Sequence, residues 1–220
     1  MTPKKKPASR TPLSKARVLH AAIDLADREG LGALTMRRLG AELGFEAMSL
    51  YKHVANKEEI LEGMVELIVG QIAIPHTGAD WKEAMRRRAH SAREVLSQHS
   101  WVIGLLEARA LGGPAAMRYL NAILGNLMAG GFPIEQAAHA FNLLDCYVYG
   151  HVIQETLLAP SAPENPTESA PSSPDHTTMS EYPHLLAMYE HAQTFEYTFD
   201  GEFDFGLELI LDGLERYRST

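Results

Sequence analysis

The segment from Thr35 to Lys57 constrains the fold of this chain more than any other part of the sequence. Four apolar residues in it are spaced by four, seven and four positions, which suits two helices packed on a shared core: Leu39, Leu43, Leu50 and Val54. The Thr35 hydroxyl can accept from the free N–H groups of a first helical turn, and Gly44 can take the left-handed conformation that ends a helix. Gly40, one turn earlier, leaves room for another helix to cross closely. The pattern predicts two short helices joined by a tight turn, the first capped by Thr35 and the second over about residues 46–54.

Helical patterns also flank this segment on both sides. Residues 14–29 form an amphipathic stretch that Gly30 stops. Asn56 is placed to cap a further helix, predicted over about residues 57–74, with Glu59 at the capping-box position. We therefore expect a three-helix head over residues 14–57 that is joined to the rest of the chain by a continuous helix.

The segment resembles the DNA-binding helix-turn-helix of the tetracycline-repressor (TetR) family of bacterial regulators. The residues that carry the resemblance are Leu34-Thr35, Leu39, Leu43-Gly44, the run Ser49-Leu50-Tyr51-Lys52-His53-Val54, and Asn56-Lys57. The resemblance implies that Ser49 and its neighbours face base edges and that Tyr51, His53 and Lys57 hold phosphates. Arg38 is expected to contact either a base or a phosphate. The full set predicted to contact DNA is Thr35, Arg37, Arg38, Ala47, Met48, Ser49, Tyr51, Lys52, His53 and Lys57.

Charge is divided unequally along the chain. The net charge is −8, yet residues 1–57 contain 11 Lys and Arg against 5 acidic residues, a net charge of +6 that leaves −14 for the remainder. A basic head is attracted to DNA phosphates, and an acidic body is repelled by them. Residues 1–13, with three prolines and three consecutive lysines, are expected to form a flexible basic arm. Such an arm either enters a minor groove or stays a solvated tail.

Residues 58–220 are expected to form a larger helical domain. Capping residues and helix breakers predict helices over about residues 80–98, 100–111, 114–129, 133–158, 180–195 and 202–217. Residues 159–178 contain five prolines and almost no apolar residues, so we expect a disordered loop there. Since no stretch alternates as a strand would, the predicted fold class is all-α.

The resemblance also implies a homodimer, built through the helices 133–158 and 202–217, and a small-molecule effector bound in the body. A twofold dimer would present two recognition helices to a palindromic double-stranded DNA operator. Aromatic, methionine and polar residues of the body are candidates for the effector pocket, although each one alone also fits ordinary core packing. The candidates are Arg88, Ala92, Trp101, Leu105, Met117, Phe141, Asp145 and Gln154.

No cofactor or metal site is predicted. His151 and Glu155 share one helix face and His139 precedes them by about three turns, but so few residues are more typical of an interface or a solvated pair than of a metal site. Family members that bind tetracycline hold it as a magnesium chelate through a histidine and a glutamate. The glutamate position is Gln154 here and residues 100–107 contain no histidine, so tetracycline is not the expected effector.

Motifs of catalysis are missing from the sequence. It contains no nucleophile elbow, HExxH, CxxC or Gly-rich phosphate loop, so an enzyme is not expected. The single cysteine, Cys146, excludes an internal disulfide and suits the cytoplasm, and no apolar run is long enough to span a membrane. The sequence therefore predicts a ligand-responsive DNA-binding regulator, in the first instance a repressor. An all-helical enzyme acting on a small molecule, or a helical scaffold without DNA binding, is the alternative.

Overall fold

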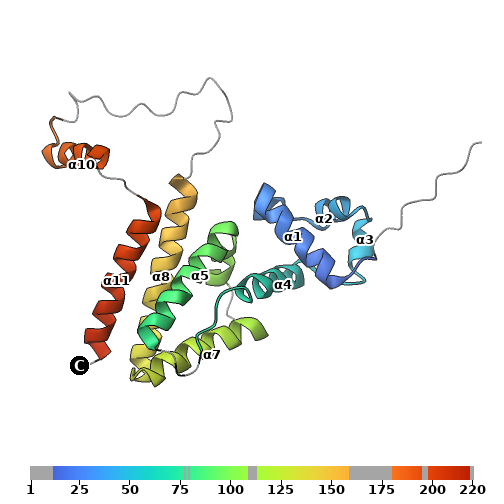
Figure 1. Ribbon diagram of the computed structural model, residues 1–220. Helices are drawn as coiled ribbons and strands as arrows, with labels where there is room; N and C mark the ends of the chain where they lie inside the picture. The colour runs from blue at the N-terminus through green and yellow to red at the C-terminus, as the bar shows by residue number, and fades with distance from the viewer. Residues whose placement is uncertain are drawn as a thin grey trace, which may run out of the picture.

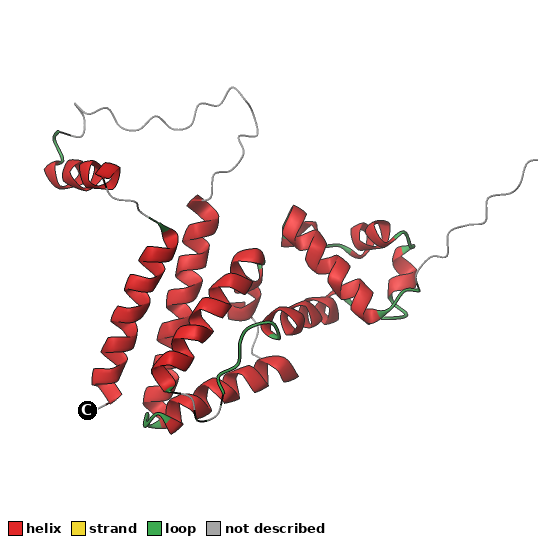
Figure 2. Ribbon diagram, in the orientation of Figure 1, coloured by secondary structure: helices red, strands yellow, loops and turns green. Residues whose placement is uncertain are grey.

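The computed structural model describes residues 12–76, 78, 80–108, 113–158, 180–194 and 198–218. Every regular element in these ranges is a helix, which confirms the all-α prediction (Figure 2). The Pro-rich segment 159–178 lies outside the described residues, as does the basic arm apart from residues 12 and 13.

The head consists of α1 (Lys15–Glu29), a 3-10 turn η1 (Leu31–Ala33), α2 (Met36–Leu43) and α3 (Ala47–Leu50). Local hydrogen bonds start its helices as predicted. The Ser14 hydroxyl accepts from the backbone N–H of Arg17 at 3.3 Å, and the Thr35 hydroxyl accepts from the N–H of Arg38 at 3.1 Å. Gly44 ends α2 with φ 73° and ψ 29°, the left-handed conformation that a residue with a Cβ adopts at a cost.

The second helix of the motif is shorter than predicted, because α3 ends at Leu50 rather than near Val54. The chain continues as turns in which the N–H groups of His53 and Val54 both donate to the Leu50 carbonyl, at 2.8 and 3.1 Å. Asn56 must be extended, at φ −160°, to cap the next helix, so the chain has to leave helical geometry before it. Leu50 and Val54 are both buried despite this change of backbone.

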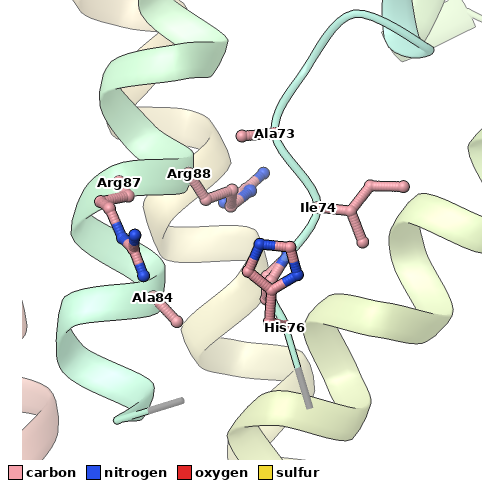
Figure 3. A pocket seen from close by; sticks show the side chains of 7 residues that line it. Ala73, Ile74, His76, Ala84, Arg87 and Arg88 are labelled. Atoms are coloured by element: carbon pink, nitrogen blue, oxygen red, sulfur yellow. The ribbon is translucent and has the colours of Figure 1, made fainter.

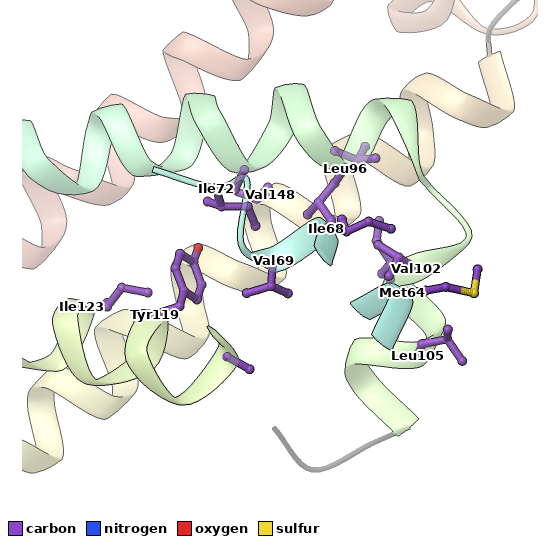
Figure 4. Packing of buried hydrophobic residues seen from close by; sticks show 14 of the residues in the cluster. Met64, Ile68, Val69, Ile72, Leu96, Val102, Leu105, Tyr119, Ile123 and Val148 are labelled. Carbon is purple, nitrogen blue, oxygen red and sulfur yellow. The ribbon is translucent and has the colours of Figure 1, made fainter. Parts of the chain in front are cut away.

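Helix α4 (Lys57–Val69) connects the head to the body (Figure 1). Its predicted end near residue 74 is wrong, because the helix ends at Val69 and a turn follows. Ile72 is nevertheless buried, alongside Ile68 and Val69, against the body residues shown in Figure 4. The apolar spacing in the sequence indicates which residues are buried, and a residue outside a helix can be buried as well as one inside it. On the other side of α4, a Cβ at Gly63 would lie 2.7 Å from both Leu19 Cδ atoms, so α1 packs directly onto α4.

The body contains α5 (Trp81–Gln98), α6 (Val102–Ala108), α7 (Pro114–Ala129), α8 (Ile134–Leu158), α10 (Pro183–Thr194) and α11 (Phe199–Arg218). Helix α8 packs against α5, α7 and α11, and α11 also contacts α5. Figure 1 shows α5, α8 and α11 side by side, with α10 standing apart from them. The bounds of α5, α7 and α8 agree with the prediction, while α11 begins three residues earlier than expected. Within the described ranges, no helix has the length and apolar character needed to cross a membrane.

Candidate functional site

The residues predicted to contact DNA lie on one part of the head, along α2, α3 and the turn that follows. Met48 is 72% exposed and Tyr51 is 45% exposed, so neither belongs to the core. The side chains of Thr35, Arg37 and Lys52 are also exposed, and those of Arg38, Ala47, Ser49, His53 and Lys57 are half-buried. Every residue of the predicted set is therefore exposed or half-buried, and Lys57 is the first residue of α4.

Close packing of α2 and α3 fixes how this surface is presented. A Cβ on Gly40 would lie 2.9 Å from the carbonyl oxygen of Phe45 and 3.1 Å from the backbone nitrogen of Ala47. These atoms belong to the turn and to the first residue of α3, so only glycine allows α3 to cross α2 at this distance. This confirms the prediction that Gly40 leaves room for another helix to cross closely.

The basic residues of the head fall into two groups. Arg37, Lys52 and Lys57 take part in no ion pair among the described residues. Arg38 instead donates through Nε to Glu29 at 3.2 Å and through Nη1 to Glu42 at 3.1 Å. The hydrogen bond from Arg38 holds the pKa of Glu29 below its ordinary value. In this structure two carboxylates of the head share the Arg38 guanidinium, and its contact with DNA stays a prediction.

A buried polar cluster lies at the centre of the body, between α5, α7 and α8. Arg88, 2% exposed, forms an ion pair with Asp145 through Nη2 and donates through Nε to the hydroxyl of Tyr119 at 2.7 Å. Tyr149 donates to the second oxygen of Asp145 at 3.4 Å. The guanidinium also lies 5.5 Å from the ring centroid of Phe141. This cluster joins three of the predicted pocket residues, Arg88, Phe141 and Asp145.

Burial and charge fix the protonation states in the cluster. Burial by itself lowers the pKa of Arg88, but its interactions with Tyr119 and Asp145 outweigh burial and leave that pKa above its ordinary value. Burial raises the pKa values of Tyr119 and Tyr149, and the charge of Asp145 raises both further. The cluster is therefore a guanidinium–carboxylate pair held by two neutral phenols.

The other predicted pocket residues do not join this cluster. Trp101 donates to Asp27 of the head, Met117 is 56% exposed and Gln154 is exposed. Ala92 and Leu105 are buried within the apolar core. Tyr149, one helical turn after Asp145 on α8, is among the aromatic residues that the sequence offers as possible pocket lining. The sequence-based prediction missed Tyr119, and no local signal pointed to it.

The pair His151 and Glu155 is not arranged as a metal site. Glu155 accepts two hydrogen bonds from Arg93, which keeps the pKa of Glu155 below its ordinary value. His151 lies among aromatic rings of α8 and α11, and burial lowers its pKa. His139 is exposed. In the part of the chain that the structure describes, no group of three or more His, Cys, Asp or Glu side chains is placed to hold a metal ion.

Polar contacts join the head and α4 to the body. On α1, Asp27 Oδ1 accepts from Trp101 Nε1 at 2.7 Å and lies 2.8 Å from His99 Nδ1. On α4, the Glu66 carboxylate accepts from the backbone N–H groups of Ala115 and Ala116, at 2.7 and 3.2 Å, and so caps the start of α7. The head is therefore connected to the body through side chains as well as through the continuous chain.

Two family models together cover most of this sequence. The model of bacterial regulatory proteins of the tetR family matches residues 18–64, and that of the tetracyclin repressor-like C-terminal domain matches residues 74–218. The chain belongs to the TetR family. The first match covers the helices of the head together with the start of α4, and the second covers the body.

Curated relatives of this TetR-family chain are transcriptional regulators. The chain is 31% identical to the HTH-type transcriptional repressor DrrR1 of Streptomyces coeruleorubidus, over 92% of this chain and 77% of that protein. It is 29% identical to the class A tetracycline repressor from transposon 1721 of Escherichia coli, over 94% and 93% of the two chains. Among solved structures, ActR of Streptomyces coelicolor in complex with actinorhodin matches with a TM-score of 0.73 at 26% identity, over 96% of this chain and 100% of that chain.

Proposed function

We propose that this TetR-family protein represses transcription by binding a palindromic DNA operator and that a small molecule bound in its body releases it. One observation carries the DNA-binding part of the proposal. The short helix α3 is held against α2 by the Gly40 contact. Three nearby cations form no ion pair among the described residues: Arg37, Lys52 and Lys57. Phosphates supply the missing countercharge.

We assign the contacts as follows. Ala47, Met48 and Ser49 on α3 face base edges in the major groove, while Arg37 and Lys52 contact phosphates on either side. The backbone N–H groups at the start of α2, next to Thr35, add to the phosphate contacts. Tyr51, His53 and Lys57 hold phosphates beyond α3. In this structure Arg38 pairs with Glu29 and Glu42 within the head.

The proposed dimer uses α8 and α11. These helices pack against each other and both expose large apolar side chains, which are Leu143, Ile153, Leu157, Phe205 and Leu209. Exposed apolar area of this kind is typical of a surface that a second subunit covers. A twofold pair of this chain would place two heads on one face of DNA and would act in the cytoplasm, where the DNA is.

Coupling between effector and DNA would run through α4. Glu66 of α4 binds the start of α7, whose Tyr119 belongs to the Arg88 cluster. A ligand that changes the cluster is therefore placed to shift α4 and with it the head. Such a ligand weakens DNA binding only to the extent that it binds the DNA-free arrangement of α4 and the head more tightly than the DNA-bound arrangement. ActR, which is similar in fold, has been solved with the small molecule actinorhodin bound.

The test is fluorescence anisotropy of the purified protein on DNA from upstream of its own gene and on scrambled DNA, across a salt series. We expect selective binding to the upstream DNA that weakens steeply with salt. Arg37→Gln should weaken binding to both DNAs, whereas the charge-matched control Arg118→Gln, exposed on α7, should bind as wild type. Absence of binding to any DNA at low salt, after unbiased site selection from genomic fragments, would refute the proposal.

A further inference from the structure

A small pocket lies where the segment after α4 passes over α5 (Figure 3). Its volume is about 80 Å³. It is lined by residues 73–76 and by Ala84, Arg87 and Arg88. Its walls are mainly apolar, and the polar side chains among the lining residues are His76, Arg87 and Arg88, with no carboxylate among them.

Arg88 supplies the feature that points to a ligand. Two of its three guanidinium nitrogen atoms are used inside the protein, Nε on Tyr119 and Nη2 on Asp145. The third, Nη1, is buried and has no hydrogen-bond partner among the described residues. Buried donors of charged groups are nearly always paired, because an unpaired one loses its hydration without compensation.

The protonation states of the cluster decide which ligand atom fits. Tyr119 and Tyr149 stay neutral, and Asp145 is already shared by Arg88 and Tyr149. Arg87, on the pocket rim, adds a second guanidinium, and its ion pair with Glu83 is long, at 3.6 Å, and largely exposed. The pocket therefore offers donors and positive charge and needs an acceptor, for which a carboxylate is well matched to a guanidinium.

We propose that this pocket binds the carboxylate of an organic acid effector, with one oxygen on Nη1 of Arg88 and the other directed toward Arg87 and His76. The inference rests on the proposed function, since it names the chemical class of the effector. The pocket volume suits one small acid group rather than a drug-sized molecule, whose pockets are typically about 300–1,000 Å³. The site is thus an anchor for one end of the effector.

The position of the pocket links an anchored acid to the head. Residues 73–76 directly follow the turn that ends α4, and the Ala73 N–H donates to Ser91 Oγ on α5 at 2.9 Å. A carboxylate between this segment and α5 would therefore act on the end of α4 that lies in the body. It would bias the arrangement of α4 without contacting the head.

The experiment uses 4-bromobenzoate as the probe and 4-bromobenzamide as its uncharged counterpart. Thermal unfolding and titration calorimetry of the full chain should show binding of the acid at least roughly tenfold tighter than of the amide, the difference expected for one charge-assisted hydrogen bond. Arg88→Lys keeps a cation for Asp145 but removes Nη1, so it should lose this preference. Arg86→Lys, the same change on the side of α5 where Arg86 pairs with Glu83 and with Glu208 of α11, should keep it.

A co-crystal of the wild-type protein with 4-bromobenzoate keeps the proposal testable if Arg88→Lys does not fold. Anomalous scattering from bromine locates the probe, and we expect its carboxylate on Arg88 Nη1. A probe bound elsewhere, or equal affinity for acid and amide, would overturn the inference. Binding of inorganic phosphate as tight as that of the acid would also overturn it, because the site would then take inorganic oxyanions. Binding to DNA is measured in parallel by fluorescence anisotropy. If the protein binds no DNA, the proposed function is refuted, but the proposed carboxylate site is not.

Discussion

Replacing Gly40 with alanine tests the helix crossing that presents α3. The new Cβ would lie 2.9 Å from Phe45 O and 3.1 Å from Ala47 N, both backbone atoms that cannot rotate away. An extra methyl group in such a contact costs about 1–3 kcal/mol, and the upper half of that range applies when backbone must move. Alanine regains about 1 kcal/mol over glycine inside a helix. The net loss in the free energy of unfolding is then about 1–2 kcal/mol, which lowers Tm by about 2–8 °C in a chain of this size.

Gly125→Ala is the matched control. Gly125 lies inside α7, is exposed, and has no atom within 4 Å of an added Cβ. Only the helix preference acts there, so Tm should rise by about 2–4 °C. Thermal unfolding followed by circular dichroism measures both variants, and anisotropy should show weaker DNA binding for Gly40→Ala alone. If Gly40→Ala raised Tm as Gly125→Ala does, the close crossing of α2 and α3 would be wrong.

Four further changes test other parts of the structure. Lys52→Gln should weaken DNA binding and reduce the slope of log affinity against log salt by about 1, and an unchanged slope would remove Lys52 from the interface. Asp27→Ala removes an acceptor shared by two body side chains and should lower the free energy of unfolding by about 1–2 kcal/mol in denaturant titrations, whereas wild-type stability would contradict the head–body contact. The pKa of Glu155 is held below 4.5 in the folded protein, chiefly by Arg93. The ionised Glu155 therefore stabilises the fold above pH 4.5, and this stabilisation is lost as the pH falls through the pKa of the folded state. Glu155→Gln should flatten the acid side of a plot of Tm against pH. Burial is the main cause that lowers the pKa of His151 below 6.5 in the folded protein. As the pH drops below 6.5, the unfolded chain binds a proton at His151 before the folded chain does, so the stability of the wild type should fall. In His151→Phe this contribution to the loss of stability should be absent.

The candidate sites differ in how far the sequence could predict them. The set predicted to contact DNA occupies one continuous stretch of the sequence, from Thr35 to Lys57. Within this stretch Arg38 has partners in Glu29 and Glu42, which lie nine and four positions away. The effector set was drawn from four separate helices, and only Arg88, Phe141 and Asp145 meet. Residues that share a helix face can pack in several ways, and a sequence does not say which helices will be neighbours.

The sequence by itself determined the starts of α1, α2 and α4 and the end of α2. Ser14, Thr35 and Asn56 each cap a helix through a hydrogen bond to the N–H three residues ahead, and Gly44 needs only its own backbone freedom. These are local interactions, so a local pattern encodes them. Even here the apolar spacing indicated which residues are buried rather than which are helical, since Val54 and Ile72 are buried outside the helices.

Only the tertiary structure decided which distant groups meet. The Arg88–Asp145 pair joins residues 57 positions apart, and the Trp101–Asp27 hydrogen bond joins residues 74 positions apart. Such pairs form because the packing of apolar helix faces brings two backbones together, and the polar groups caught between them must then satisfy one another or stay unpaired. Nη1 of Arg88, which has no hydrogen-bond partner among the described residues, results from that packing, and no spacing in the sequence predicted it.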